Sequence, residues 1–213
     1  MDDEWSKIKP LTEPEALSIV KAYGEDHGYI MERIDTNKLP AGKRAPDYKA
    51  LKESKPIFLC EVKTPGHIIN QITKMYHWDT TFNKLRNHIH TANKQFGDFD
   101  KGHSFPRILA FTSNHPQLNW TSLQQNILAE VKFGDRLLRD YKGKTFVIDT
   151  NKDIQAIDIF LWMQINRFNK KIYELAIYVN QNPINIELVN KISISLAPYS
   201  NEGIKAPNYS AIK

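Results

Sequence analysis

The sequence predicts an α/β protein in which helices flank a mixed central sheet. Residues 57–63, IFLCEVK, are apolar almost throughout, which is typical of a strand covered on both faces. Around this strand the expected elements run helix, strand, strand, strand, helix, strand, an order that indicates the α/β class. The chain has 213 residues, enough for one domain with a substantial core, and we see no linker or repeat that divides it.

The first predicted elements surround a short turn. Thr12 and Glu15 form a capping-box pattern, so a helix is expected to begin at Thr12 and to end at Gly24. Residues 29–36 alternate in polarity as a strand does, and residues 45–51 are expected to be extended again. These segments lead into the apolar strand.

The next predicted element is an amphipathic helix within residues 67–96. Apolar residues recur there at helical spacing: Phe82, Leu85, Ile89, Ala92 and Phe96. Polar residues lie off this apolar seam: Lys84, Arg86, Asn87, His88 and Lys94. Residues 107–113 are then predicted to form another strand.

The C-terminal half is expected to add strands and helices to a core that spans about residues 12–113. Helices are predicted for residues 121–131 and 154–164, and extended segments for residues 144–149, 171–179, 184–189 and 191–196. The whole chain, residues 1–213, is therefore interpreted as one core, a C-terminal elaboration over residues 114–197, and a loose tail over residues 198–213.

Composition limits the class of protein more than its activity. The formal net charge of +5 suits a polyanionic partner but is modest. Cys60 is the single cysteine, so an internal disulfide framework and a multi-cysteine zinc site are excluded. The N-terminal residues do not resemble a signal peptide, and no apolar run approaches the roughly 18 residues of a membrane span. A cytoplasmic protein without a membrane partner is the expectation.

Three charged residues at the ends of neighbouring segments suggest chemistry. Glu61 and Lys63 are two apart on one strand, so they point to the same face. If the strand that follows Asp47 pairs beside them, two carboxylates and an ammonium converge. Two carboxylates with room for water and phosphate are typical of a Mg²⁺ site, and a nearby lysine can orient water or neutralise phosphate.

This pattern resembles the signature of the PD-(D/E)XK nuclease superfamily, which includes many restriction endonucleases. Pro46 and Asp47 match the first part of the signature, and residues 61–63, EVK, match the second. The family's core also runs helix, three strands, helix, strand. The resemblance implies a restriction-endonuclease-like fold, covers about residues 12–113, and leaves the C-terminal hundred residues unexplained.

The resemblance also implies a function and a set of roles. Asp47 and Glu61 would bind Mg²⁺, for which Mn²⁺ can substitute, the main-chain carbonyl of Val62 would add a ligand, and Lys63 would position the hydrolytic water. Glu15 on the first helix is a further candidate ligand, although its capping-box position explains it without catalysis. We expect a metal-dependent endonuclease of the restriction, defence or repair type that acts on double-stranded DNA, and a homodimer is compatible with this.

Polar residues near the motif are candidates for contacts with nucleic-acid phosphates: Lys43, Arg44, Lys49, Gln71, Lys74, Lys84 and Arg86. For each of them taken alone, an ordinary solvated side chain is the simpler interpretation. His88 and His90 lie about 200° apart around a helix and cannot easily chelate one ion, so we interpret them as solvated residues on a basic face. Cys60 alternates away from Glu61 and is expected in the core.

Two alternatives from other classes stay open. The chain could be a nucleic-acid-binding module that keeps the fold without cutting, although two carboxylates facing a phosphate without metal would repel it. It could equally cut RNA or a structured DNA, because the same site attacks any phosphodiester placed before it. A structural alternative is that Glu61 and Lys63 form a surface ion pair at a strand end.

Overall fold

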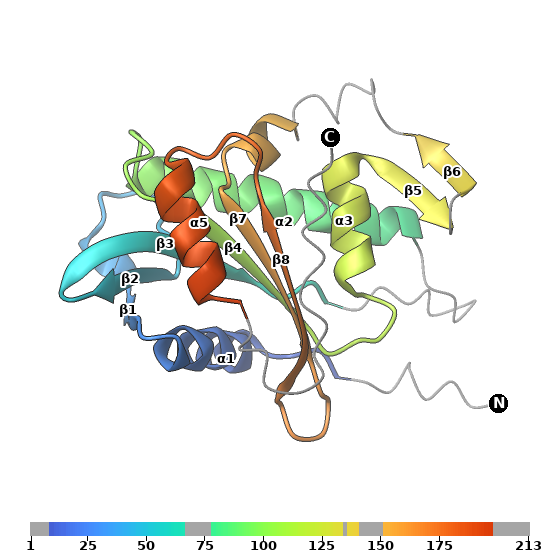
Figure 1. Cartoon of the computed structure of the whole chain (residues 1–213), viewed down its shortest axis with the longest axis horizontal. Coiled ribbons are helices and arrows are strands. Elements are labelled where there is room, and N and C mark those ends of the chain that lie inside the picture. The colour runs from blue at the N-terminus through green and yellow to red at the C-terminus, as the bar shows by residue number, and fades with distance from the viewer. Residues whose placement is uncertain (1–8, 67–77, 134–135, 141–150, 198–213) are drawn as a thin grey trace.

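The computed structural model describes residues 9–66, 78–133, 136–140 and 151–197. Within these ranges a six-stranded sheet has the order β1-β2-β3-β4-β7-β8, and helices pack against both of its faces (Figure 1). The strands of this sheet are β1 (Ile30–Arg33), β2 (Tyr48–Lys52), β3 (Lys55–Lys63), β4 (Arg107–Ser113), β7 (Ile159–Ile165) and β8 (Ile172–Val179). The predicted α/β class with a mixed central sheet is confirmed.

The remaining elements surround the sheet. The helices are α1 (Glu13–Asp26), α2 (Trp78–Phe99), α3 (Trp120–Leu128) and α5 (Ile186–Ser195), with a short 3-10 turn η2 (Thr36–Lys38); residues 151–155 are also helical. A separate antiparallel hairpin consists of β5 (Glu130–Phe133) and β6 (Arg136–Asp140). No helix in the described part of the chain is long and apolar enough to cross a membrane.

Strand directions divide the sheet into two antiparallel edges and a parallel centre. β1, β2 and β3 are joined by antiparallel pairing, as are β7 and β8 at the other edge. β3, β4 and β7 run parallel to one another. Because parallel strands end at the same edge of a sheet, the C-terminal ends of β3, β4 and β7 lie together.

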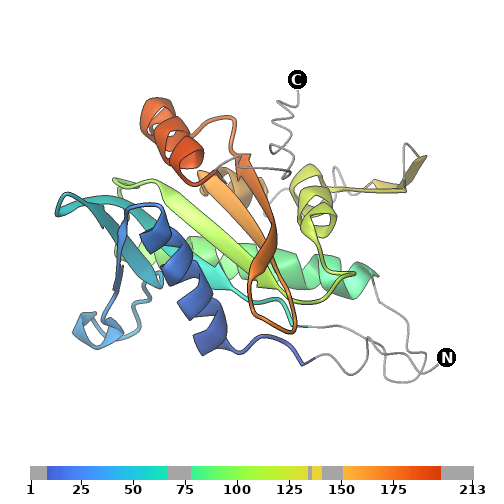
Figure 2. The same ribbon diagram turned by 60° about the horizontal axis from the view of Figure 1, so that its bottom comes forward.

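Two core clusters cover the two faces of the sheet. One cluster joins α1 and α5 to residues of the strands that include Tyr48, Cys60 and Val62. The other joins α2 and α3 to the alternate residues, including Leu59 and Leu109. Figure 2 shows α1 in front of the sheet and α2 behind it. Cys60 is buried in the first cluster, as predicted.

The N-terminal half follows the predicted order α1, β1, β2, β3, α2, β4. Thr12 and Glu15 form the expected capping box at the start of α1. The end of α1 was predicted at Gly24 but lies at Asp26, and Gly28 takes the positive φ of 80° instead. Gly24 is needed for close packing, since a Cβ there would lie 2.7 Å from the sulfur of Met31 on β1.

Residues 154–164 do not form the predicted helix. A helix ends at residue 155, and β7 then begins at Ile159. All seven residues of β7 are buried, because β7 pairs with a strand on each side and is covered on both faces. A short apolar run of this kind has no periodicity that separates a buried strand from a buried helix.

Residues 184–189 and 191–196 were predicted as strands, but α5 spans Ile186–Ser195. Asn185 caps this helix by accepting a hydrogen bond from the Leu188 amide at 3.0 Å. Val189 and Ile192 are buried against the sheet at helical spacing. Serine and isoleucine alternate in residues 192–195, a pattern that is typical of a strand, whereas the residues that are buried follow the helical period.

Three further predictions concern the chain after β4. The helix predicted for residues 121–131 ends at Leu128, where Ala129 takes a left-handed conformation, and β5 follows. Residues 144–149, predicted as extended, lie outside the described residues. β8 confirms the extended segment predicted for residues 171–179. Since β7 and β8 belong to the same sheet as β1–β4, the C-terminal half completes the central sheet.

Candidate active site

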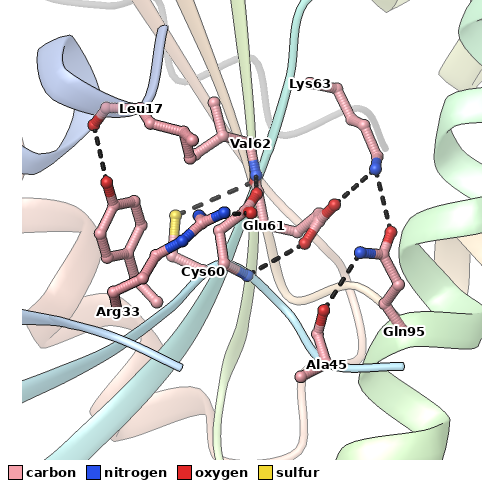
Figure 3. A network of polar contacts seen from close by, with 10 residues as sticks. Leu17, Arg33, Ala45, Cys60, Glu61, Val62, Lys63 and Gln95 are labelled. Carbon is pink, nitrogen blue, oxygen red and sulfur yellow. Dashed lines mark hydrogen bonds and ion pairs between the residues drawn. The ribbon is translucent and has the colours of Figure 1, made fainter. Parts of the chain in front are cut away.

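Asp47 and Glu61 meet where β2 begins and β3 ends. The two strands are antiparallel neighbours with Tyr48 opposite Cys60, which confirms the predicted adjacency. The Asp47 amide donates a hydrogen bond to Glu61 Oε2 at 3.1 Å, and the Val62 amide donates to Asp47 Oδ2 at 2.8 Å. Figure 3 shows this exchange between the two segments. The carboxylates thus take the place of main-chain partners where the β2–β3 ladder stops.

The alternation of strand side chains places this pair on the α2 face of the sheet. Tyr48, Cys60 and Val62 belong to the core under α1, and the Tyr48 hydroxyl donates to the Leu17 carbonyl at 3.0 Å. Glu61 therefore points the other way, toward α2, and is only 1% exposed. A surface ion pair at a strand end is excluded by this burial.

Glu15 does not join the pair. Its side chain accepts hydrogen bonds from Thr12 in the capping box, and its other oxygen lies 3.4 Å from Lys170 Nζ. α1, which carries Glu15, packs on the face of the sheet opposite Glu61. The expectation that Glu15 is a further metal ligand is therefore wrong, and the capping box accounts for this residue.

Lys63 is held by two oxygen acceptors. Its Nζ lies 2.5 Å from Glu61 Oε1 and 2.9 Å from Gln95 Oε1. Gln95, on α2, in turn donates through Nε2 to the Ala45 carbonyl at 3.1 Å (Figure 3). An ammonium group has three donors, so one remains after these two bonds among the described residues. Glu61 and Gln95 therefore hold the Lys63 side chain in place, and one N–H of its ammonium group remains to donate to a further acceptor.

Sequence reasoning did not identify Gln95. It lies seven residues after His88, which places both on one side of α2. The helical period therefore predicted that these two residues share a face, but it could not say that this face meets the end of β3. Only the packing of α2 on the sheet provides that information.

Arg33 is a second residue that sequence reasoning did not identify. Its Nη1 lies 2.5 Å from Asp47 Oδ1, so both oxygens of Asp47 have partners. The Arg33 side chain is 49% exposed, whereas the Asp47 side chain is largely buried. Arg33 stands opposite Tyr48 in the β1–β2 register, and this pairing brings it to the site.

Burial and charge alter the ionisation of Glu61. Its burial, followed by the nearby Asp47 carboxylate, raises the pKa of Glu61 to about 7, and Lys63 opposes this rise. Two carboxylates so close in a buried place resist carrying two full negative charges. A cation bound between them would remove that resistance.

His88 is not the solvated residue that was expected. Burial, followed by the charges of Lys63 and Lys84, lowers the pKa of His88 to about 4, so the ring is neutral at neutral pH. The ring packs edge-on against Phe111 with centroids 6.4 Å apart. The Nδ1 atom of His90 lies 2.7 Å from Asp153 Oδ2. The two histidines therefore have different surroundings, in agreement with their spacing on the helix.

The donors present at the site fit a small divalent cation of the Mg²⁺ type. In the ranges that the structure describes, no group of three or more histidine, cysteine, aspartate or glutamate side chains is placed to hold a metal. Mg²⁺ does not need such a group, because it binds through one or two carboxylates and keeps several waters. Asp47 and Glu61 supply two hard oxygen donors, and the Val62 carbonyl stays a predicted third ligand.

The residues proposed to contact nucleic acid are distributed around the site with different surroundings. Arg44 is exposed, and three lysines have described partners: Lys43 with Asp98 at 3.1 Å, Lys49 with Glu32 at 3.2 Å, and Lys84 with the Gly66 carbonyl at 3.2 Å. Arg86 is only 5% exposed, and its guanidinium lies 4.4 Å from the centre of the Phe82 ring. The expectation that Arg86 lies on a solvent-facing basic side is therefore wrong. Gln71 and Lys74 lie outside the described residues.

Comparisons with protein-family models, with curated proteins and with solved structures found no match for this chain. Any proposal of function therefore has to be argued from the residues of the site and their surroundings.

Proposed function

We propose that the protein is a Mg²⁺-dependent nuclease that hydrolyses phosphodiester bonds in duplex DNA. One observation carries the proposal: Asp47, Glu61 and Lys63 form a single, partly buried network where β2 begins and β3 ends. Two carboxylates and a lysine in this relation resemble the PD-(D/E)XK signature. The element order α1, β1, β2, β3, α2, β4 supports a restriction-endonuclease-like fold.

Asp47, Glu61 and the Val62 carbonyl are the residues that would hold the metal. A bound Mg²⁺ supplies Lewis-acid polarisation of a phosphate and activation of water. The raised pKa of Glu61, caused by burial and then by Asp47, supports a cation at this place, because a cation favours the ionised carboxylates. Arg33 has to release Asp47 Oδ1 for that oxygen to serve as a ligand, and the Arg33 side chain, which is 49% exposed, can remain over the Tyr48 ring, 5.4 Å from its centre, when it does so.

Lys63 orients the attacking water or a phosphate oxygen with its remaining donor. Glu61 and Gln95 hold the ammonium from two sides, so its direction is set before substrate arrives. His88 stays neutral beside it and adds no competing charge at neutral pH. Gln95 acts through Lys63, so we regard it as a positioning residue.

The direct test is incubation of the purified protein with supercoiled plasmid, linear duplex, single-stranded DNA and RNA, in Mg²⁺ or in EDTA. Asp47→Ala, Glu61→Ala and Lys63→Ala are each expected to lower cleavage by at least about 100-fold. Glu187→Ala is the matched control, because it removes an exposed carboxylate that contacts only Lys191 among the described residues.

Calorimetric titration with Mg²⁺ separates the roles. The two carboxylate variants should lose the metal, whereas Lys63→Ala should keep it and still fail to cut. Cleavage at the wild-type rate by all three variants would show that another site, or a contaminant, is responsible. Preferential cleavage of RNA would retain the site and change the substrate.

A second function is favoured by the contacts of Asp47. Since Arg33 and Val62 satisfy both of its oxygens, the network is balanced without any ion. A nucleic-acid-binding module without catalysis would keep such a network for structural reasons. This alternative predicts no Mg²⁺ binding and no cleavage, together with nucleic-acid binding that EDTA does not alter.

A further inference from the structure

The hairpin that joins β7 to β8 has an unusual surface. Its residues 166–171, NRFNKK, carry three cationic side chains and no acidic one. Phe168 at its tip is 80% exposed, more than any other large hydrophobic residue in the described part of the chain. The Arg167 guanidinium lies 4.5 Å from the centre of the Phe168 ring, so an aromatic face and a cation are presented together.

The tip is an ordered turn. Asn166 Oδ1 accepts hydrogen bonds from the amides of Phe168 at 2.9 Å and Asn169 at 3.3 Å. The Asn166 amide donates to the Lys171 carbonyl at 2.8 Å, which closes the turn between the strands. The aromatic ring is therefore held outward on a defined two-stranded ribbon.

The hairpin leaves the sheet from the same edge as the candidate active site. Lys63 pairs with Phe111 on β4, and Phe111 pairs with Trp162 on β7, so Lys63 and Trp162 lie at one level of the parallel strands. β7 lies two strands from β3, and from Trp162 the chain runs on to Phe168 at the hairpin tip, at most about 20 Å further along the strand direction. Figure 1 shows this hairpin (orange) projecting beyond the rest of the sheet.

We propose that residues 166–171 form a contact surface for duplex DNA, which places Phe168 against the base pairs and the three cations on phosphates. This rests on the proposed nuclease function for its choice of partner. A two-stranded ribbon fits the major groove, and aromatic side chains also insert at base steps. A duplex whose axis follows the strand direction past the end of the sheet covers the distance from the level of Lys63 to Phe168 in at most about six base pairs.

Lys170 has one described partner, Glu15 Oε1 at 3.4 Å, and both side chains are more than a third exposed. Such a pair is weak and screened by salt, so Lys170 can exchange Glu15 for a phosphate. Lys171 is exposed as well. The charge of the hairpin is thus available to a polyanion approaching from solvent.

The test measures binding separately from cleavage, by fluorescence anisotropy of a labelled 30-base-pair duplex in EDTA at several salt concentrations. Lys170→Gln combined with Lys171→Gln should flatten the slope of log K against log salt by about 1 to 2, since each phosphate contact contributes about 0.9. Phe168→Ala should weaken binding about tenfold and keep the slope. Lys21→Gln combined with Lys191→Gln is the charge-matched control and should bind as the wild type does.

This inference alone would be overturned if the wild-type protein binds and cuts duplex DNA and the hairpin variants keep the same affinity and salt slope. Binding that depends on the hairpin, without Mg²⁺-dependent cleavage, would support the inference and overturn the nuclease. Failure of the wild type to bind any duplex would overturn both. Hairpin-dependent binding to vesicles of anionic phospholipid, with no duplex binding, would assign the surface to a membrane and overturn the DNA contact.

Discussion

Replacing Glu61 with glutamine is expected to change how the free energy of unfolding depends on pH. Burial and Asp47 raise the pKa of Glu61 to about 7, against an ordinary value of 4.5. The folded state therefore binds this proton more tightly than the unfolded state does. It follows that the wild type loses stability as pH rises from about 4.5 to about 7, and that the loss is complete above this window.

The size of this effect follows from the shift in the pKa. A rise of the pKa from 4.5 to about 7 corresponds to roughly 3 kcal/mol, most of which falls between about pH 5 and about pH 8. Glutamine does not titrate, so the variant lacks this component. The stability of Glu61→Gln relative to wild type should rise by roughly 2 to 3 kcal/mol across that range, whatever the difference between the two proteins at low pH.

Urea denaturation followed by circular dichroism, in EDTA and at several pH values, measures the difference. Glu187→Gln is the control, because its hydrogen bond with Lys191 lowers the pKa of that exposed carboxyl and gives any effect the opposite sign. A difference between Glu61→Gln and wild type that stays constant within about 0.5 kcal/mol would refute the reasoning. Glu61 would then ionise like a solvated carboxylate, and its burial beside Asp47 would have no electrostatic consequence.

Three further outcomes test the surroundings of the site. Burial lowers the pKa of His88 to about 4, so the folded state resists protonation of this ring. Acidification from about pH 7 to about pH 4 should therefore lower the free energy of unfolding of the wild type by up to about 3 kcal/mol, a loss that His88→Phe should not show. The same dependence of unfolding free energy on pH in both proteins would contradict this. Gln95→Ala should lower kcat about tenfold without changing the Kd for Mg²⁺. Gln95→Glu can still accept a hydrogen bond from Lys63, so it should recover part of the rate. Equal rates in the two variants would show that Gln95 has a purely structural role. Arg33→Gln removes the cation beside Asp47 and should tighten Mg²⁺ binding about fivefold, as measured by calorimetry; an unchanged Kd would mean that the guanidinium does not compete with the metal.

Local patterns in the sequence were sufficient for the N-terminal half of the fold. The capping box of Thr12 and Glu15 is made by residues three apart, so it forms wherever the helix packs. The apolar seam of α2 has the period of a helix, and the IFLCEVK run is long enough for a buried strand. Strand alternation alone predicted that Glu61 and Lys63 share a face, and they do.

Local patterns failed where burial on two sides removed the periodicity. β7 is apolar at nearly every position because it has a strand on each side and is covered on both faces, and helix and strand are then indistinguishable from spacing. The prediction for α5 failed for a different reason: serine and isoleucine alternate there, whereas the buried residues Val189, Ile192 and Ser193 follow the helical period. In both segments, packing against residues distant in the sequence determined whether a strand or a helix formed.

The sequence by itself determined which residues of the candidate site are charged and which of them can face the same way. Tertiary structure decided what surrounds them: β1 pairing brings Arg33 to Asp47, and α2 packing brings Gln95 to Lys63. It also decided that Arg86 is buried and that Glu15 lies across the sheet from Glu61. The Arg33–Asp47 and Lys63–Gln95 contacts join residues 14 and 32 positions apart in the sequence. The helix and strand periods carry no information over such separations. Only packing, which removes apolar surface from water, selects which faces meet.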